Sequence, residues 1–173
     1  MASSAEAKLT VDEISQKLID FSIDREDLKI IISRLPEGEA INPVAVEYEI
    51  QLLKIISVGW SASFFLGEHP KKTEVASMFW GGINELSKNL STVTTTTTGT
   101  EIDYFQTIKD RLDHYLGELN RQSGVEDPAA IIGPAFARMC EHDDNVHVVM
   151  AGARMFNLAV GGVKAYLESV EIV

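Results

Sequence analysis

NPVAVEYEIQLLKIISVGWSASFFLG, at residues 42–67, is the stretch that decides the fold of this chain. Asn42-Pro43 favours a helix start, because an Asn side chain accepts hydrogen bonds from free backbone N–H groups and a proline at the first helical position has no N–H to leave unpaired. From Ile50 onward, apolar residues cover nearly the whole circumference of the helix, and Gly67 ends it. A helix that is apolar on all sides has to be surrounded by other helices. We therefore predict that residues 43–66 form the central and most buried element of a bundle.

The most apolar part of this helix, Ile50 to Leu66, is also the segment to weigh as a membrane span. It contains Lys54 and several serines, and it is shorter than the roughly 20 apolar residues that a membrane-spanning helix needs. We therefore interpret it as a helix buried in protein. The first ten residues lack the basic start and the apolar stretch of a secretory signal, which favours a cytoplasmic location.

Amphipathic patterns on both sides of the central helix predict the other helices. Thr10 and Glu13 fit a capping box, and apolar residues then recur at helical spacing to about residue 35, as two short helices or one kinked helix. Four more helices are expected, near residues 70–90, 100–122, 128–141 and 144–170. No stretch alternates convincingly between apolar and polar residues, so we expect no sheet. The predicted fold class is all-α, a single-domain bundle of about six helices over residues 1–173.

A threonine-rich tract separates two of the predicted helices. Ser91 to Thr100 holds a run of five threonines from Thr94 to Thr98 and has no apolar stripe. Threonine favours extended or capping conformations over helix interiors. The tract is therefore predicted to be an exposed, flexible connection at residues 91–100.

The composition limits the classes of partner. The 173 residues include 26 Asp and Glu against 15 Lys and Arg, for a formal net charge of −11. Such an excess of acid works against a surface that neutralises phosphates or anionic lipids, so we expect neither nucleic acid nor a membrane as partner. A single cysteine, Cys140, excludes an internal disulfide.

Two groups of residues are candidate metal ligands. His142, Asp144 and His147 fall close together in the sequence, and Asp110 and His114 are four residues apart on another predicted helix. Carboxylates and imidazoles on two facing helices hold the metal ions of di-metal bundles. The alternative is that the first group belongs to a capped turn between two helices and that the second is an exposed pair. We prefer the capped turn.

Catalytic signatures are not found in the sequence. It contains no Gly-x-Ser-x-Gly elbow, and the acids beside Cys140 disfavour the thiolate that a reactive cysteine needs. The glycine pairs Gly81-Gly82 and Gly161-Gly162 lie inside helical runs and not in a phosphate-binding loop. The sequence therefore predicts no catalytic residue and specifies no cofactor, and it leaves open whether the protein is an enzyme.

Small residues gather in the last predicted helix and suggest close packing. Packing within the chain accounts for most of them, but the helix carries more small residues than one groove needs, so we predict a homodimer. The preferred function is binding or self-association, with a second copy or another protein as partner. The alternative is a metal- or small-ligand-binding bundle, and in that case an enzyme is also conceivable, with its site around His142, Asp144 and His147. The small residues are Ala151, Gly152, Ala153, Ala159, Gly161, Gly162 and Ala165.

Overall fold

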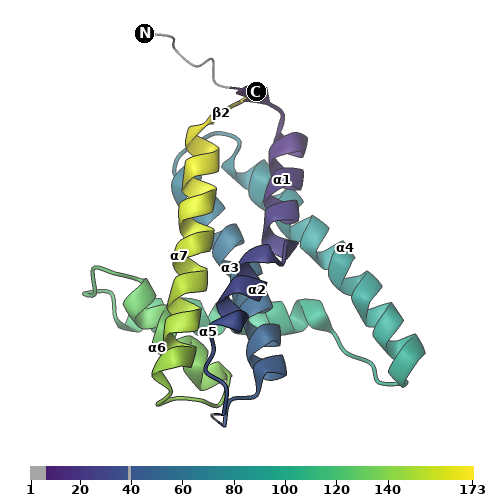
Figure 1. Cartoon of the computed structure of the whole chain (residues 1–173). Helices are drawn as coiled ribbons and strands as arrows, with labels where there is room; N and C mark the ends of the chain where they lie inside the picture. Colours follow the sequence, from purple (N-terminus) through teal and green to yellow (C-terminus); the bar gives the residue numbers. More distant parts are fainter. Residues whose placement is uncertain (1–6, 39) are drawn as a thin grey trace.

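Helix α3 runs through the middle of the fold and contacts each of the six other helices (Figure 1). The structure is a computed structural model, and it describes residues 7–38 and 40–173. Within this part of the chain, seven helices and two short strands confirm the predicted all-α bundle. The elements are β1 (Ala7–Leu9), α1 (Val11–Ile23), α2 (Glu26–Ser33), α3 (Pro43–Leu66), α4 (Lys72–Thr98), α5 (Tyr104–Arg121), α6 (Ala129–Met139), α7 (Val146–Glu168) and β2 (Val170–Ile172).

The bounds of α3 are those predicted from the sequence. The Asn42 side chain accepts hydrogen bonds from the N–H groups of Val44 and Ala45, Pro43 opens the helix, and Gly67 follows it with a φ of 51°. Fourteen of the 24 residues of α3 are buried, more than in any other described helix. The short α6 is buried over a larger share of its length, at 7 of 11 residues. The prediction that α3 is the most buried element therefore holds by number of residues and not by fraction.

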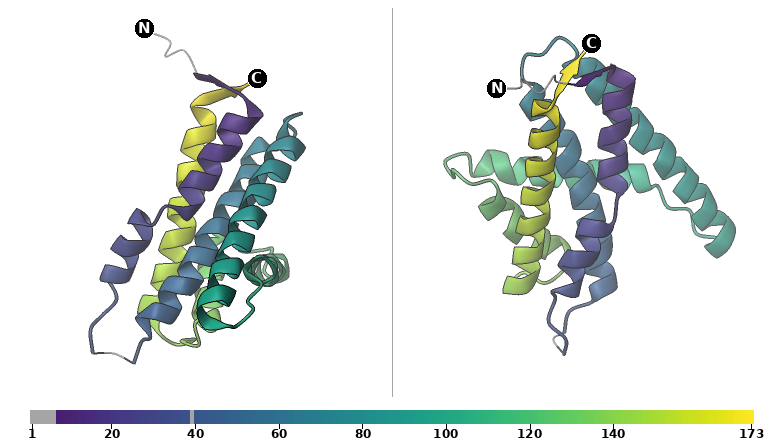
Figure 2. Two further views of the ribbon diagram at one scale, coloured as in Figure 1. Left: turned by 90° about the vertical axis from the view of Figure 1, so that its right-hand side faces the viewer. Right: turned by 45° about the horizontal axis from the view of Figure 1, so that its top comes forward.

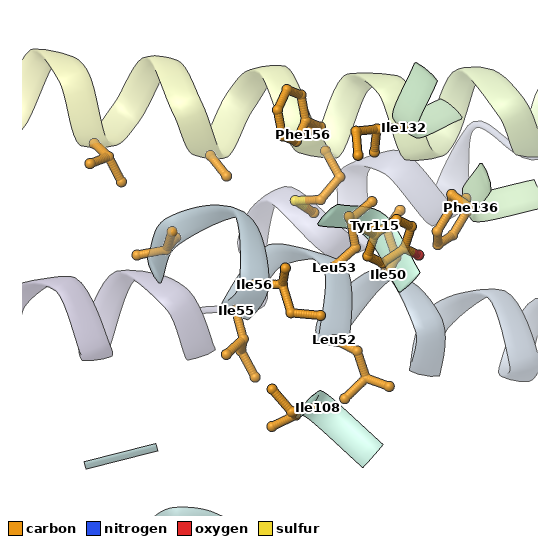
Figure 3. Packing of buried hydrophobic residues seen from close by; sticks show 14 of the residues in the cluster. Ile50, Leu52, Leu53, Ile55, Ile56, Ile108, Tyr115, Ile132, Phe136 and Phe156 are labelled. Atoms are coloured by element: carbon orange, nitrogen blue, oxygen red, sulfur yellow. The ribbon is translucent and has the colours of Figure 1, made fainter. Parts of the chain in front are cut away.

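Long apolar side chains of α3 meet those of α5, α6 and α7 in the core (Figure 3). Ile50 and Leu53 of α3 lie near Tyr115 of α5 and Phe136 of α6 in this view. By length and composition, both α3 and α7 could cross a membrane. In this fold 72% of the apolar window of α3 is buried inside the protein, as the core helix of a bundle requires.

The N-terminal helices are two, and the break between them is held by a buried lysine. The predicted capping box of α1 is present, with Thr10 and Glu13 each accepting a backbone hydrogen bond from the other. Between α1 and α2, the ammonium of Lys54 donates to the carbonyl oxygen of Asp24 at 2.7 Å and lies 3.5 Å from the carboxylate of Asp27. The lysine therefore satisfies a carbonyl that the helix break leaves open.

A small sheet joins the two ends of the described chain, against the expectation of none. β1 and β2 pair in parallel, with Ala7 opposite Val170 and Leu9 opposite Ile172. Figure 2 shows the pair at the end of the bundle where α1 begins and α7 ends. Each strand has three residues, which is too short to show the alternation that marks a strand in a sequence.

Helix α4 is longer than predicted, because the threonine-rich tract is helical up to Thr98. Gly99 ends the helix in the left-handed conformation, so the connection to α5 is residues 99–103 and not 91–100. The threonines tolerate the helix because their hydroxyls donate to backbone carbonyls four residues earlier. These bonds run from Thr92 to Lys88, Thr95 to Ser91, Thr96 to Thr92 and Thr98 to Thr94. The flexibility of the tract stays a prediction.

Helices α5, α6 and α7 complete the bundle. Helix α5 crosses the long axis of the bundle and is seen nearly end-on in the left view of Figure 2. Pro134 lies inside α6 without splitting it. The close approach of α6 to α7 requires Gly133, because a Cβ atom there would lie 2.8 Å from the carbonyl oxygen of Val149.

Candidate functional site

The predicted ligands His142, Asp144 and His147 lie where α6 passes into α7. His142 and Asp144 are in the connection itself, and His147 is the second residue of α7. Asn145 caps α7, since its side chain accepts hydrogen bonds from the N–H groups of His147 and Val148. The connection is not helical, so the helical spacing that would align these side chains on one face does not apply.

His142 links this turn to the central helix. Its Nε2 atom accepts a hydrogen bond of 3.4 Å from the backbone N–H of Asn42, the residue that caps α3. The nitrogen lone pair that a metal ion would need is therefore directed at a backbone donor. This contact gives His142 a structural role at the junction of α3, α6 and α7.

Asp110 and His114 lie one turn apart on α5, as predicted. The Asp110 carboxylate accepts a hydrogen bond of 2.9 Å from the side-chain amide of Gln106. His114 has its ring centroid 5.5 Å from that of Tyr115, and its Nε2 atom is buried with no hydrogen-bond partner. Burial lowers the pKa of His114, against the attraction of Glu118. Within residues 7–38 and 40–173, no group of three or more His, Cys, Asp or Glu side chains is placed to hold a metal ion, so the structure does not join the two predicted sets.

A buried ion pair between α3 and α5 is the polar feature that the sequence analysis missed. Glu49 of α3 is 6% exposed, and its two carboxylate oxygens accept hydrogen bonds from Nη2 and Nε of Arg111 at 2.6 and 2.8 Å. A two-point contact of this kind fixes both distance and orientation. The pair therefore sets how α5 crosses α3. The only signal for it was a single acid, Glu49, at the start of the most apolar segment.

Cys140 lies close to this pair and is unsuited to nucleophilic chemistry. Its side chain is buried at the end of α6, and burial, followed by the charge of Glu49, raises the pKa of the thiol to about 12. The thiolate is the reactive form of cysteine. The direction of this shift agrees with the expectation from the sequence, although its main cause is burial and not the acids that follow Cys140.

A second buried carboxylate connects α5 to α6. Glu118 is 7% exposed and forms ion pairs with Arg138 of α6, at 3.1 Å, and with Arg121 of its own helix. The buried carboxylates of Glu49 and Glu118 are thus both paired with arginines. These ion pairs explain how the helices are held together and present no free acid or base for catalysis.

The small residues of α7 face other helices of the same chain. A Cβ atom on Gly152 would lie 2.6 Å from the Cβ of Phe136 in α6, and one on Gly162 would lie 2.7 Å from the Phe21 ring in α1. Only Gly161, of the three glycines in α7, has open space around it. Most of the small residues from which the sequence predicted a homodimer are therefore used inside the chain, and Gly161 and Ala165 remain exposed. The homodimer itself stays a prediction.

A different surface is apolar and uncovered, on the end of α4. We call residues 85–98 the α4 arm, because α4 here extends away from the other helices (Figure 1). Leu86, Leu90 and Val93 are 36%, 59% and 62% exposed, and their spacing places them on one face. The charged residues of the arm are Glu85 and Lys88, which form an ion pair of 2.9 Å with each other.

A scan against protein-family models and searches of curated proteins and of solved structures find no significant match to this chain. The α4 arm and the grooves of the surface therefore have to be interpreted from their own geometry and charge.

Proposed function

We propose that this protein acts by self-association and that two copies dock through their α4 arms. The proposal rests on the apolar face of Leu86, Leu90 and Val93, which is exposed on a helix that leaves the bundle. An uncovered apolar face on a helix is stabilised when another apolar helix covers it.

The distribution of charge favours a second copy as the occupant. Two chains that each carry a net charge of −11 repel each other over most of their surfaces. The α4 arm is the exception, because Glu85 and Lys88 neutralise each other and the rest of the arm is uncharged. A strongly basic partner would be drawn to the acidic surfaces and not to the arm. Two neutral arms meet without this repulsion.

The arm is also suited to a symmetric contact. In an antiparallel pair of arms with Leu86 of one copy opposite Leu90 of the other, the apolar faces of the two arms cover each other. Glu85 and Lys88 lie away from the centre of this face and keep their ion pair within each arm. The same patch is used twice, which closes the assembly at two copies.

The threonines lower the cost of burying the arm. The hydroxyls of Thr92, Thr95, Thr96 and Thr98 donate to carbonyls of their own helix. Their donors therefore stay satisfied when water is removed, and an unsatisfied buried donor would cost about 1–3 kcal/mol. The methyl group of Thr96, three residues after Val93, adds apolar surface on the same side of the helix.

The mass of the particle in solution tests this proposal. Light scattering and sedimentation across a concentration series up to about 100 μM should show a particle of twice the 19.0 kDa chain mass. Leu90→Lys should return it to one chain, because two lysines would then be buried without partners. Val125→Lys is the matched control, since Val125 is 43% exposed and lies between α5 and α6, outside the arm.

Three outcomes would overturn the proposal. A single-chain mass at every concentration would exclude self-association. A dimer that survives Leu90→Lys would show that the copies meet elsewhere on the surface. A mixed-mass result from Val125→Lys would point to the connection between α5 and α6 as the interface.

A further inference from the structure

Helices α2 and α7 border a groove on the surface. No residue of the α4 arm lines it. It has a volume of about 460 Å³ and is lined by residues of both helices and by Arg34, which follows α2. Ligand sites in proteins commonly have volumes of about 300–1,000 Å³. The groove is therefore large enough for a small molecule.

Two arginines that form no ion pair with a described residue line this groove. The chain has six arginines, and four of them form ion pairs, at Arg25, Arg111, Arg121 and Arg138. Arg34 and Arg154 form none with any described residue, and both line the groove. In a chain with a net charge of −11, two unpaired guanidinium groups on one groove form a local excess of positive charge.

The one acid in the lining does not cancel this charge. Asp27 lies in the groove, but its carboxylate is 3.5 Å from the ammonium of Lys54, which is completely buried. The positive charge of Lys54 thus offsets the negative charge of Asp27 from inside the protein. The guanidinium groups of Arg34 and Arg154 are left for an anion from outside.

Apolar side chains occupy the rest of the groove. Ile30 of α2 and Leu158 of α7 line it and are 51% and 46% exposed, although they are large and apolar. Asn157 lies three residues after Arg154, on the same face of α7, and adds an amide donor. The groove thus offers N–H donors and positive charge beside an apolar surface.

We propose that this groove binds a small amphipathic carboxylate. The planar N–H forks of Arg34 and Arg154 match the two oxygens of a carboxylate, and Ile30 and Leu158 contact a short hydrocarbon chain. The limited volume favours a free small molecule over an extended peptide. This site is separate from the α4 arm, so it is independent of the proposed self-association.

Octanoate is the probe for this proposal, followed by backbone amide shifts in ¹H–¹⁵N NMR spectra of the full chain. Saturable shifts should be confined to residues 27–34 and 154–158. Octan-1-ol, which has the same chain and no charge, should bind at least about tenfold more weakly, because the charge-assisted hydrogen bonds are lost. Acetate, which has the charge and lacks the chain, should also bind more weakly by about tenfold or more.

Charge variants locate the carboxylate. Arg34→Gln and Arg154→Gln should each weaken octanoate binding by about tenfold. Lys17→Gln, which removes one exposed positive charge from α1, should leave the affinity unchanged within about twofold.

Four results would overturn the assignment. The first is no saturable shift at millimolar octanoate, and the second is saturable shifts that map to another surface. The third is an affinity that Lys17→Gln lowers as much as the two arginine variants do. Equal affinity for octanoate and octan-1-ol would show a purely apolar site and would also refute it.

Discussion

Lys54 of α3 places its ammonium nitrogen 2.7 Å from the carbonyl oxygen of Asp24, at the break between α1 and α2. The side chain is completely buried, and the ammonium also lies 4.7 Å from the centre of the Phe21 ring. A buried cation is tolerated only where such partners surround it. The central helix thus determines where the first two helices separate.

Lys54→Met should therefore destabilise the fold. The substitution retains a long apolar side chain but leaves the Asp24 carbonyl without its donor, and we expect a loss of about 1–3 kcal/mol in the free energy of unfolding. Urea unfolding followed by circular dichroism measures this loss. Lys17→Met, on the exposed face of α1, is the control and should change it by less than about 0.5 kcal/mol. Equal stability of the two variants would contradict this role of Lys54.

The Glu49–Arg111 pair should behave as a buried ion pair. Glu49→Gln leaves the guanidinium beside a neutral amide, and we expect a loss of about 1–3 kcal/mol. Glu47→Gln is the control on the same helix, because its pair with Arg25 is exposed and such pairs contribute about 0–1 kcal/mol. The double variant Glu49→Leu with Arg111→Leu should cost less than the sum of the two single changes. Strict additivity in this denaturation series would mean that the two side chains do not interact.

His114 should make the stability depend on pH. Burial lowers its pKa in the folded protein, so the unfolded chain binds this proton more readily. The free energy of unfolding should then fall as the pH decreases below about 6.5, the usual value for histidine. His114→Gln should remove this part of the decrease between pH 7.5 and 5.5 in urea unfolding. An NMR titration of the imidazole with a midpoint above the usual value would contradict the prediction.

The threonine-rich end of α4 should open more readily than the rest of the helix. No residue of α4 after Ser87 is buried in the described structure, so tertiary contacts protect Ser91–Thr98 little. Hydrogen exchange should be fast there and slow in Ile50–Leu66. Exchange in the arm should slow as the protein concentration rises, because docking of the arms would protect it. Equal protection of the arm and α3 in dilute protein would show that the tract is rigid by itself.

The turn before α7 should hold together without metal. His142→Ala removes the acceptor for the Asn42 N–H and should cost about 0.5–1.5 kcal/mol, with or without added zinc. Elemental analysis of protein purified without chelator or affinity tag should show no stoichiometric metal. Bound metal that is released as the pH falls through about 6 to 5 would instead support ligation by the histidines.

Local signals in the sequence were sufficient to predict the bounds of α3 and the N-terminal cap of α1. Asn42-Pro43, Gly67 and the pair of Thr10 and Glu13 act over a few residues, and each has the predicted role in the structure. The helical threonine tract was missed because the prediction used only the low helix preference of threonine. In the structure, threonine hydroxyls donate to backbone carbonyls four residues earlier, and these bonds satisfy the side chains within a helix.

Features that join distant parts of the chain could not be predicted. Glu49 and Arg111 are 62 residues apart, and nothing in either segment specifies the other. Arg34 and Arg154 likewise line one groove only because α2 packs beside α7. The predicted metal ligands were selected by closeness in sequence, and the break at Asn145 separates them into a connection and a helix.

The pairing of β1 with β2 also has a consequence for how the chain is made. The ion pair of Lys8 with Glu171 beside these strands spans 163 residues, nearly the full length of the sequence. During synthesis β1 is therefore an open strand edge until residues 170–172 leave the ribosome. Because α7 ends one residue before β2, the two leave the ribosome together. Once Gly162 of α7 packs against Phe21 of α1, the strands can meet without a large further loss of chain entropy. The small sheet can therefore form only after nearly the whole described chain has been synthesised.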